Sequence, residues 1–150
     1  MAQNSVVAIA NQKGGVGKTT TAINLGAALA MEGHRTILID LDPQGNASTG
    51  LGIDAEQRQK TVYDLLAGPE SLAECLVQTR IPDLSIVPAT PDLSSADVDL
   101  AQTKDRTRLL HRKLEEAPSG SIILIDCPPA LGLLTLNAMV AANGVLVPLQ

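Results

Sequence analysis

Short apolar runs alternate along the chain with segments in which apolar residues recur at helical spacing. The first run, Val6 to Ala10, leads into a glycine-rich turn, and Thr19 to Met31 then carries apolar residues three and four positions apart. A second run, Thr36 to Ile39, is β-branched and apolar until it meets Asp40, as in a buried strand. The order strand, loop, helix and strand predicts a βαβ unit at the start of the chain.

The same alternation continues to the end of the sequence. Further strands are predicted at Leu84 to Val87, Ser121 to Ile125 and Val145 to Leu149, and further helices at Thr61 to Ala67, Ser71 to Val77, Lys104 to Ala117 and Leu133 to Ala142. Asp42 to Gly52 is rich in Gly, Asn, Ser and Pro, which predicts a loop. This order is typical of an α/β fold with a mostly parallel sheet, helices on both faces, and ligands at the carboxyl ends of the strands.

The length of 150 residues fits one domain, residues 1–150, with a core of its own. Val145 to Leu149 has the apolar character of a central strand, yet the sequence stops at Gln150 without the helix that normally covers such a strand. We therefore expect residues 1–150 to be an incomplete, N-terminal portion of the full fold.

The composition indicates which kinds of surface and which cellular compartment to expect. Hydrophobic residues make up 45%, the net charge is −5, and Tyr63 is the single aromatic residue, so a nucleic-acid surface is not expected within these residues. Cys75 and Cys127 lack a metal-type or redox spacing, and Met1 to Ser5 does not resemble a signal peptide. Leu131 to Leu149 is interrupted by Asn, Gly and Pro, which a membrane span does not favour. We expect a cytoplasmic protein with free thiols and no membrane contact.

The segment from Gln12 to Thr20, QKGGVGKTT, lies between the first predicted strand and the first predicted helix. Its glycines let successive backbone N–H groups point at phosphate oxygens, and the helix N-terminus adds a partial positive charge. Lys18 is expected to reach the β- and γ-phosphates of a nucleotide, and the Thr19 hydroxyl to ligate Mg²⁺. The predicted nucleotide-binding residues are Lys13, Gly14, Gly15, Val16, Gly17, Lys18, Thr19 and Thr20.

The loop departs from the standard pattern, because Gln12 stands where a glycine is usual and a second lysine, Lys13, opens the loop. In this it resembles the deviant phosphate loop of the ParA/MinD family of P-loop NTPases. The resemblance implies that Lys13 reaches across a dimer to the partner's ATP. A dinucleotide-binding pattern starting at Gly15 fails, because it requires glycine where the chain has Thr20.

Two acidic strand ends complete the pattern. Asp126 follows the apolar run Ile122 to Ile125, which is typical of a strand whose aspartate holds Mg²⁺. Asp40 to Asn46, DLDPQGN, closely resembles the first switch region of ParA/Soj-type proteins. That resemblance implies that Asp42 positions the attacking water and that Asp40 supports the Mg²⁺ shell, while a simple turn opener is the alternative for Asp42.

Together these strings resemble a chromosome or plasmid partition ATPase of the ParA/Soj type, and Gly45 to Gly52 favours that group over MinD. The resemblance implies a weak ATPase that uses ATP and Mg²⁺, with Lys13, Lys18 and Asp42 catalytic and Thr19, Asp40 and Asp126 at the metal. It also implies an ATP-dependent homodimer, a ParB-like partner that stimulates hydrolysis, and nonspecific DNA binding through residues beyond 150. The ATP state is then associated with the nucleoid.

Other interpretations stay open. A MinD-like membrane-cycling regulator requires a C-terminal amphipathic helix, and a metabolic ATP-dependent ligase of the same superfamily requires a small-molecule pocket. Cys127 follows the metal aspartate as in iron–sulfur relatives, but a second suitably placed cysteine is missing, so a packing role is expected. The basic residues between Arg106 and Lys113 share their segment with acids and are expected to form a solvated face.

Overall fold

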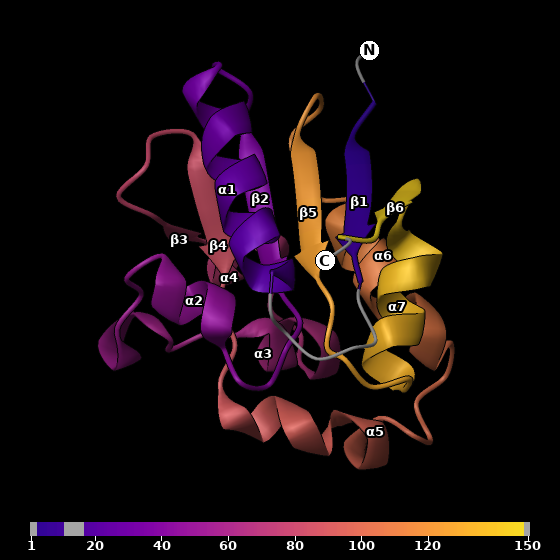
Figure 1. Ribbon diagram of the computed structural model, residues 1–150. Helices are drawn as coiled ribbons and strands as arrows, with labels where there is room; N and C mark the ends of the chain where they lie inside the picture. Colours follow the sequence, from indigo (N-terminus) through magenta and orange to yellow (C-terminus); the bar gives the residue numbers. More distant parts are fainter. Residues whose placement is uncertain (1–2, 11–16, 149–150) are drawn as a thin grey trace.

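The computed structural model of the chain describes residues 3–10 and 17–148 (Figure 1). The strands in these ranges are β1 (Ser5–Ile9), β2 (Thr36–Asp40), β3 (Val77–Gln78), β4 (Leu84–Val87), β5 (Ile122–Asp126) and β6 (Gly144–Leu146). The α-helices are α1 (Lys18–Met31), α2 (Asn46–Gly50), α3 (Val62–Ala67), α4 (Leu72–Cys75), α5 (Ala96–Asp99), α6 (Leu109–Leu114) and α7 (Leu133–Ala141). Short 3₁₀ turns are η1 (Ala55–Gln57), η2 (Pro91–Ser95) and η3 (Arg106–Arg108).

The strands form one sheet in the order β3-β4-β2-β5-β1-β6. All neighbouring pairs from β4 to β6 are parallel, and only the two-residue β3 runs antiparallel to its neighbour β4. The prediction of a mostly parallel sheet is confirmed. Its carboxyl edge brings together the ends of β1, β2 and β5, which are the strands that precede the predicted phosphate loop and the two acidic segments.

The two faces of the sheet carry separate hydrophobic clusters, because successive side chains of a strand point to opposite faces. On one face Leu38 of β2 clusters with Ala22 of α1, and α2 covers the same side. On the other face Ile39 clusters with Leu110 of α6 and Ala138 of α7, together with α3 and α4 (Figure 1). Helices on both faces confirm the predicted layers.

Three predicted elements are corrected by the structure. The helix predicted over Lys104 to Ala117 is shorter, because Asp105 adopts a left-handed φ of 56° and the α-helix begins only after η3. The helix predicted over Ser71 to Val77 ends at Cys75, since Val77 pairs with Ile86 of β4. The predicted loop from Asp42 to Gly52 contains the helical turn α2, whose Ser48 is held by the carboxylate of Asp40.

Leu131 to Leu149 contains α7 followed by β6, as predicted. Within the described residues β6 pairs only with β1 and lies at the edge of the sheet, and a central place for this strand in the full fold stays a prediction. Val145 and Val147 are each 53% exposed. No helix within residues 3–10 and 17–148 has the length and apolar character needed to cross a membrane.

Candidate active site

Two aspartates end neighbouring strands at the carboxyl edge of the sheet. Asp40 is the last residue of β2 and Asp126 is the last residue of β5, and the two are direct partners in the register of these parallel strands. Both side chains are fully buried. The apolar runs before them thus deliver two carboxylates to one place, as the sequence pattern predicted.

Lys18 and Thr19, the first residues of α1, both contact Asp126. Gly17 precedes them with a left-handed φ of 91°, which glycine adopts without steric cost. The Lys18 ammonium forms a fully buried ion pair with Oδ1 of Asp126. The Thr19 hydroxyl donates to Oδ2 of the same carboxylate at 3.0 Å. The end of the phosphate loop and the second acidic strand therefore meet at one carboxylate.

The remaining residues that were predicted to bind the nucleotide lie either in the first turn of α1 or outside the described residues. Thr20 lies in the first turn of α1 and is exposed. Lys13, Gly14, Gly15 and Val16 lie outside the described residues. Their predicted roles stay predictions, and the described part of the site consists of Lys18, Thr19 and the acidic strand ends.

Burial has the largest effect on the pKa of the Asp126 carboxyl. Desolvation raises the pKa of its carboxyl, although the Lys18 ammonium and the Thr19 hydroxyl both act to lower it. A carboxylate in this setting is stabilised by a nearby cation, because few water molecules reach it. The ammonium group of Lys18 supplies that cation.

The carboxylate of Asp40 accepts two hydrogen bonds from Ser48. Its Oδ2 accepts from the Ser48 backbone N–H at 2.9 Å and from the Ser48 hydroxyl at 2.6 Å, while Oδ1 accepts from the Asp42 backbone N–H at 3.3 Å. The Ser48 oxygen in turn accepts from the backbone N–H of Ala89 at 3.1 Å. Asp40 therefore fixes the start of α2 and the backbone of Asp42 in addition to its predicted place beside a metal ion.

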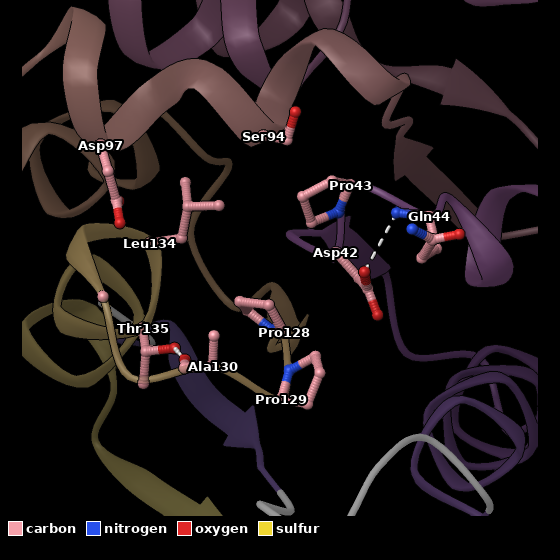
Figure 2. A pocket seen from close by; sticks show the side chains of 11 residues that line it. Asp42, Pro43, Gln44, Ser94, Asp97, Pro128, Pro129, Ala130, Leu134 and Thr135 are labelled. Carbon is pink, nitrogen blue, oxygen red and sulfur yellow. Dashed lines mark hydrogen bonds between the residues drawn. The ribbon is translucent and has the colours of Figure 1, made fainter.

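Asp42 lies at the border between this cluster and a cavity of about 330 Å³. It is 5% exposed, and its Oδ1 accepts from the backbone N–H of Gln44 at 3.0 Å. Figure 2 shows Pro128 and Pro129, which follow Asp126 closely in the chain, near Asp42 in this cavity. The Asp42 side chain thus borders a partly open cavity, and its role in orienting a water molecule stays a prediction.

Three residues with contacts at or near the site were not predicted from the sequence: Ser48, Arg58 and Asp97. The Arg58 guanidinium donates to the carbonyl oxygens of Ile53 and Ala89 and to the Thr49 hydroxyl, so it ties the α2 region to the end of β4. Asp97 lines the cavity. Ser48 falls within the segment from Gly45 to Gly52 that carried part of the family resemblance. For Arg58 and Asp97 the sequence contained no pattern that indicated a role near the site.

Cys127 is fully buried directly after Asp126, and burial raises the pKa of its thiol to about 12. Cys75 is also free and buried, and its thiol pKa is raised by burial to about 11. Thiols with such raised pKa values are poor metal ligands and poor nucleophiles at neutral pH. This agrees with the predicted packing role of Cys127.

The oxygen donors at the carboxyl edge fit Mg²⁺ in composition. Thr19, Asp40 and Asp126 offer hydroxyl and carboxylate oxygens, which are the ligands that this ion prefers. Within the described ranges no group of three or more His, Cys, Asp or Glu side chains could hold a metal ion alone. Such a set suits an ion that takes most of its ligands from phosphates and water.

Asp40 should make the stability of the chain depend on pH when nucleotide and Mg²⁺ are absent. Burial raises the pKa of its carboxyl from 3.8 to about 6, although the hydrogen bonds from Ser48 act to lower it. A carboxyl whose pKa is raised on folding stabilises the folded state below its unfolded pKa, and this contribution is lost as pH rises through about 6. We expect Asp40→Asn to gain stability relative to the parent between pH 4.5 and 7.5, by on the order of 2 kcal/mol.

Urea unfolding of both proteins at the two pH values measures this difference. Asp92→Asn is the matched control, because it removes one negative charge from an exposed position in η2. If the stability difference between Asp40→Asn and the parent is the same at both pH values, the buried carboxyl is not the cause.

Comparison with known proteins agrees with this geometry. Residues 4–150 match the family model described as an AAA domain. The chain is 55% identical over 148 residues to the chromosome partitioning protein ParA of Caulobacter vibrioides, covering 97% of this chain and 55% of that protein. It is 47% identical over 146 residues to the sporulation initiation inhibitor protein Soj of Bacillus subtilis, covering 97% of this chain and 58% of that protein.

Solved structures give the same result for the fold. Cobyrinic acid a,c-diamide synthase from Mycobacterium smegmatis with bound ADP and magnesium superposes with a TM-score of 0.91 at 42% identity, covering 98% of this chain and 60% of that one. An ATP complex of a McdA variant from Cyanothece superposes with a TM-score of 0.88 at 28% identity, covering 99% and 57%. The chain thus spans little more than half the length of the curated relatives it matches.

The family match covers nearly the whole chain, and the structure brings Lys18 and Thr19 at the end of the predicted phosphate loop together with Asp126. The chain therefore belongs to the AAA domain family, as a P-loop protein of the ParA/Soj type.

Proposed function

We propose that the protein containing this chain is a partition ATPase that binds Mg-ATP, closes as a homodimer and hydrolyses the nucleotide. The observation that carries the proposal is the buried cluster of Lys18, Thr19 and Asp126 at the N-terminus of α1. Helix N-termini favour phosphate, and Lys18 is placed to exchange its carboxylate partner for phosphate oxygens. ParA and Soj relatives at 47–55% identity support the partition role.

The residues divide the chemistry between binding and water activation. Lys18 would neutralise phosphate charge, and Thr19, Asp126 and Asp40 would hold Mg²⁺, which would supply further neutralisation of phosphate charge. Asp42 orients the attacking water from the border of the cavity, and its carboxylate is held in place through Gln44. Phosphoryl transfer asks mainly for positioning and charge stabilisation, so these groups suffice.

The partners follow from the relatives and from the charge of the chain. The segment has a net charge of −5, so the nonspecific DNA surface of the proposed protein lies in residues beyond 150. A ParB-like protein stimulates hydrolysis and ends the ATP state. Localisation is cytoplasmic, with nucleoid association in the ATP state.

Lys13→Gln in the full-length protein is expected to prevent ATP-dependent dimer closure while leaving initial nucleotide binding nearly intact. The physical reason is that the Lys13 ammonium neutralises the partner's phosphates, so its loss leaves two anionic nucleotides facing each other without compensation. Light scattering with a slowly hydrolysed ATP analogue and Mg²⁺ should give a dimer mass for the parent and a monomer mass for the variant.

Lys104→Gln is the matched control, because it removes a lysine from an exposed position outside the phosphate loop. It should dimerise like the parent. Normal ATP-dependent dimers and normal turnover in Lys13→Gln would refute the role of Lys13 across the dimer.

A metabolic ligase is the second candidate, favoured by the cavity of about 330 Å³ beside Asp42 and by the 42% identity to cobyrinic acid a,c-diamide synthase. A ligase should release ADP only when an organic acceptor is present. A partition ATPase should release ADP without one and should respond to duplex DNA. Measuring ADP release by the full-length protein under these conditions separates the two.

A further inference from the structure

The helix α7 is capped by a side chain from a distant part of the chain. Its own N-cap residue, Gly132, offers no side-chain cap. Instead Oδ1 of Asp97, in α5, accepts from the backbone N–H of Leu133 at 3.0 Å, across 36 positions of sequence. A carboxylate in this place satisfies an otherwise free amide and interacts favourably with the helix dipole.

A side chain at position 132 would force the Asp97 carboxylate to shift from its present position. A Cβ built on Gly132 comes within 2.7 Å of Oδ2 of Asp97, which is closer than real contacts allow. The segment before the helix is tied further by the Thr135 hydroxyl, which donates to the Ala130 carbonyl at 2.7 Å. The first turn of α7 and the residues that precede it are thus held by side chains as well as by the helix itself.

This capped turn is connected directly to the candidate active site. The residues between β5 and α7, 127–132, follow Asp126 without interruption. Pro128, Pro129 and Ala130 line the same cavity as Asp42 and Pro43. Asp97 lies on the far side of that cavity from Asp42 (Figure 2). A movement of the first turn of α7 would therefore move the wall of the space that Asp42 borders.

We propose that Asp97 is a positioning residue for ATP hydrolysis, an inference that rests on the proposed function. By capping α7 it fixes residues 127–132, and these fix the space in which Asp42 orients water. Small displacements of a reacting water lower the rate steeply, because the geometry of attack is narrow. ATP binding is less sensitive to this wall, since Lys18 and Thr19 belong to α1.

The test compares Asp97→Ala, Asp97→Asn and the parent as full-length proteins. We expect Asp97→Ala to lower kcat for ATP hydrolysis about fivefold, with KM for ATP changed less than about twofold. Amide hydrogen exchange at Leu133 should become faster in the same variant, because its N–H loses its acceptor. Asp97→Asn keeps a side-chain oxygen as acceptor and should restore most of both values.

Asp54→Ala is the control, because Asp54 accepts from the backbone N–H of Gln57 in η1 and so also caps a turn. Its loss should leave kcat and the Leu133 amide unchanged. Unchanged exchange at Leu133 in Asp97→Ala would overturn the cap. Faster exchange with an unchanged kcat would overturn the positioning role, whereas a parent without any ATP hydrolysis would overturn the proposed function itself.

Discussion

Replacing Asp42 with alanine in the full-length protein is expected to slow ATP hydrolysis about a hundredfold while Mg-ATP still binds and the dimer still closes. The Asp42 carboxylate contacts only the backbone of Gln44 among the hydrogen bonds of the described residues, so its loss leaves Lys18, Thr19 and Asp126 in place. Turnover and equilibrium ATP binding, measured on the same preparation, separate the two effects.

Two further variants, Asp42→Asn and Asp40→Ala, test the role of the Asp42 carboxylate in hydrolysis. Asp42→Asn keeps the acceptor for the Gln44 N–H but removes the charge, so it should be slow if the charge orients or activates water. Asp40→Ala releases Ser48 and should disturb α2 and nucleotide binding as well as turnover. If Asp42→Ala hydrolyses ATP at the parental rate, Asp42 is not the acid that orients the attacking water.

The sequence predicted the elements of the fold that follow from local patterns. Buried parallel strands are continuously apolar, so β2 and β5 could be placed together with the aspartates that end them. The helical spacing after the phosphate loop likewise placed α1. The strand order β3-β4-β2-β5-β1-β6 was not predicted, because it depends on which apolar runs pair in space, and the local pattern of each run does not show its partner.

The segment from Pro91 to Asp99 shows where local patterns fail. It folds as the short turns η2 and α5, which are too short to display helical periodicity. Ser94 and Asp97 of this segment line the cavity, and Asp97 also accepts a hydrogen bond from Leu133, which is far away in the sequence. Ser48 and Ala89 are a similar case, since they meet across 41 positions. Tertiary hydrogen bonds of this kind leave no spacing to recognise.

Lys18→Ala is expected to weaken Mg-ATP binding by at least about tenfold, because one charge-assisted contact to the phosphates is lost. It should also destabilise the nucleotide-free protein. Lys18 and Asp126 are a fully buried pair, and removing one partner leaves an uncompensated buried charge. Breaking such a pair costs about 3–5 kcal/mol.

The destabilisation should depend on pH with a defined sign. Burial already raises the pKa of Asp126, and without the Lys18 ammonium this pKa rises further. A carboxyl with a raised folded pKa stabilises the folded state at low pH, and this contribution is lost as pH rises through that pKa. Urea unfolding should therefore show a larger loss for Lys18→Ala at pH 8 than at pH 5.

The double variant Lys18→Ala/Asp126→Asn separates stability from binding. The neutral amide needs no cation, so much of the stability at pH 8 should return, while Mg-ATP binding stays weak because the phosphate contact is still absent. Calorimetry with Mg-ATP and urea unfolding of the parent, the single and the double variant complete the comparison. Equal destabilisation of Lys18→Ala at both pH values would contradict the buried pair, and unchanged Mg-ATP affinity would overturn the assignment of a phosphate loop.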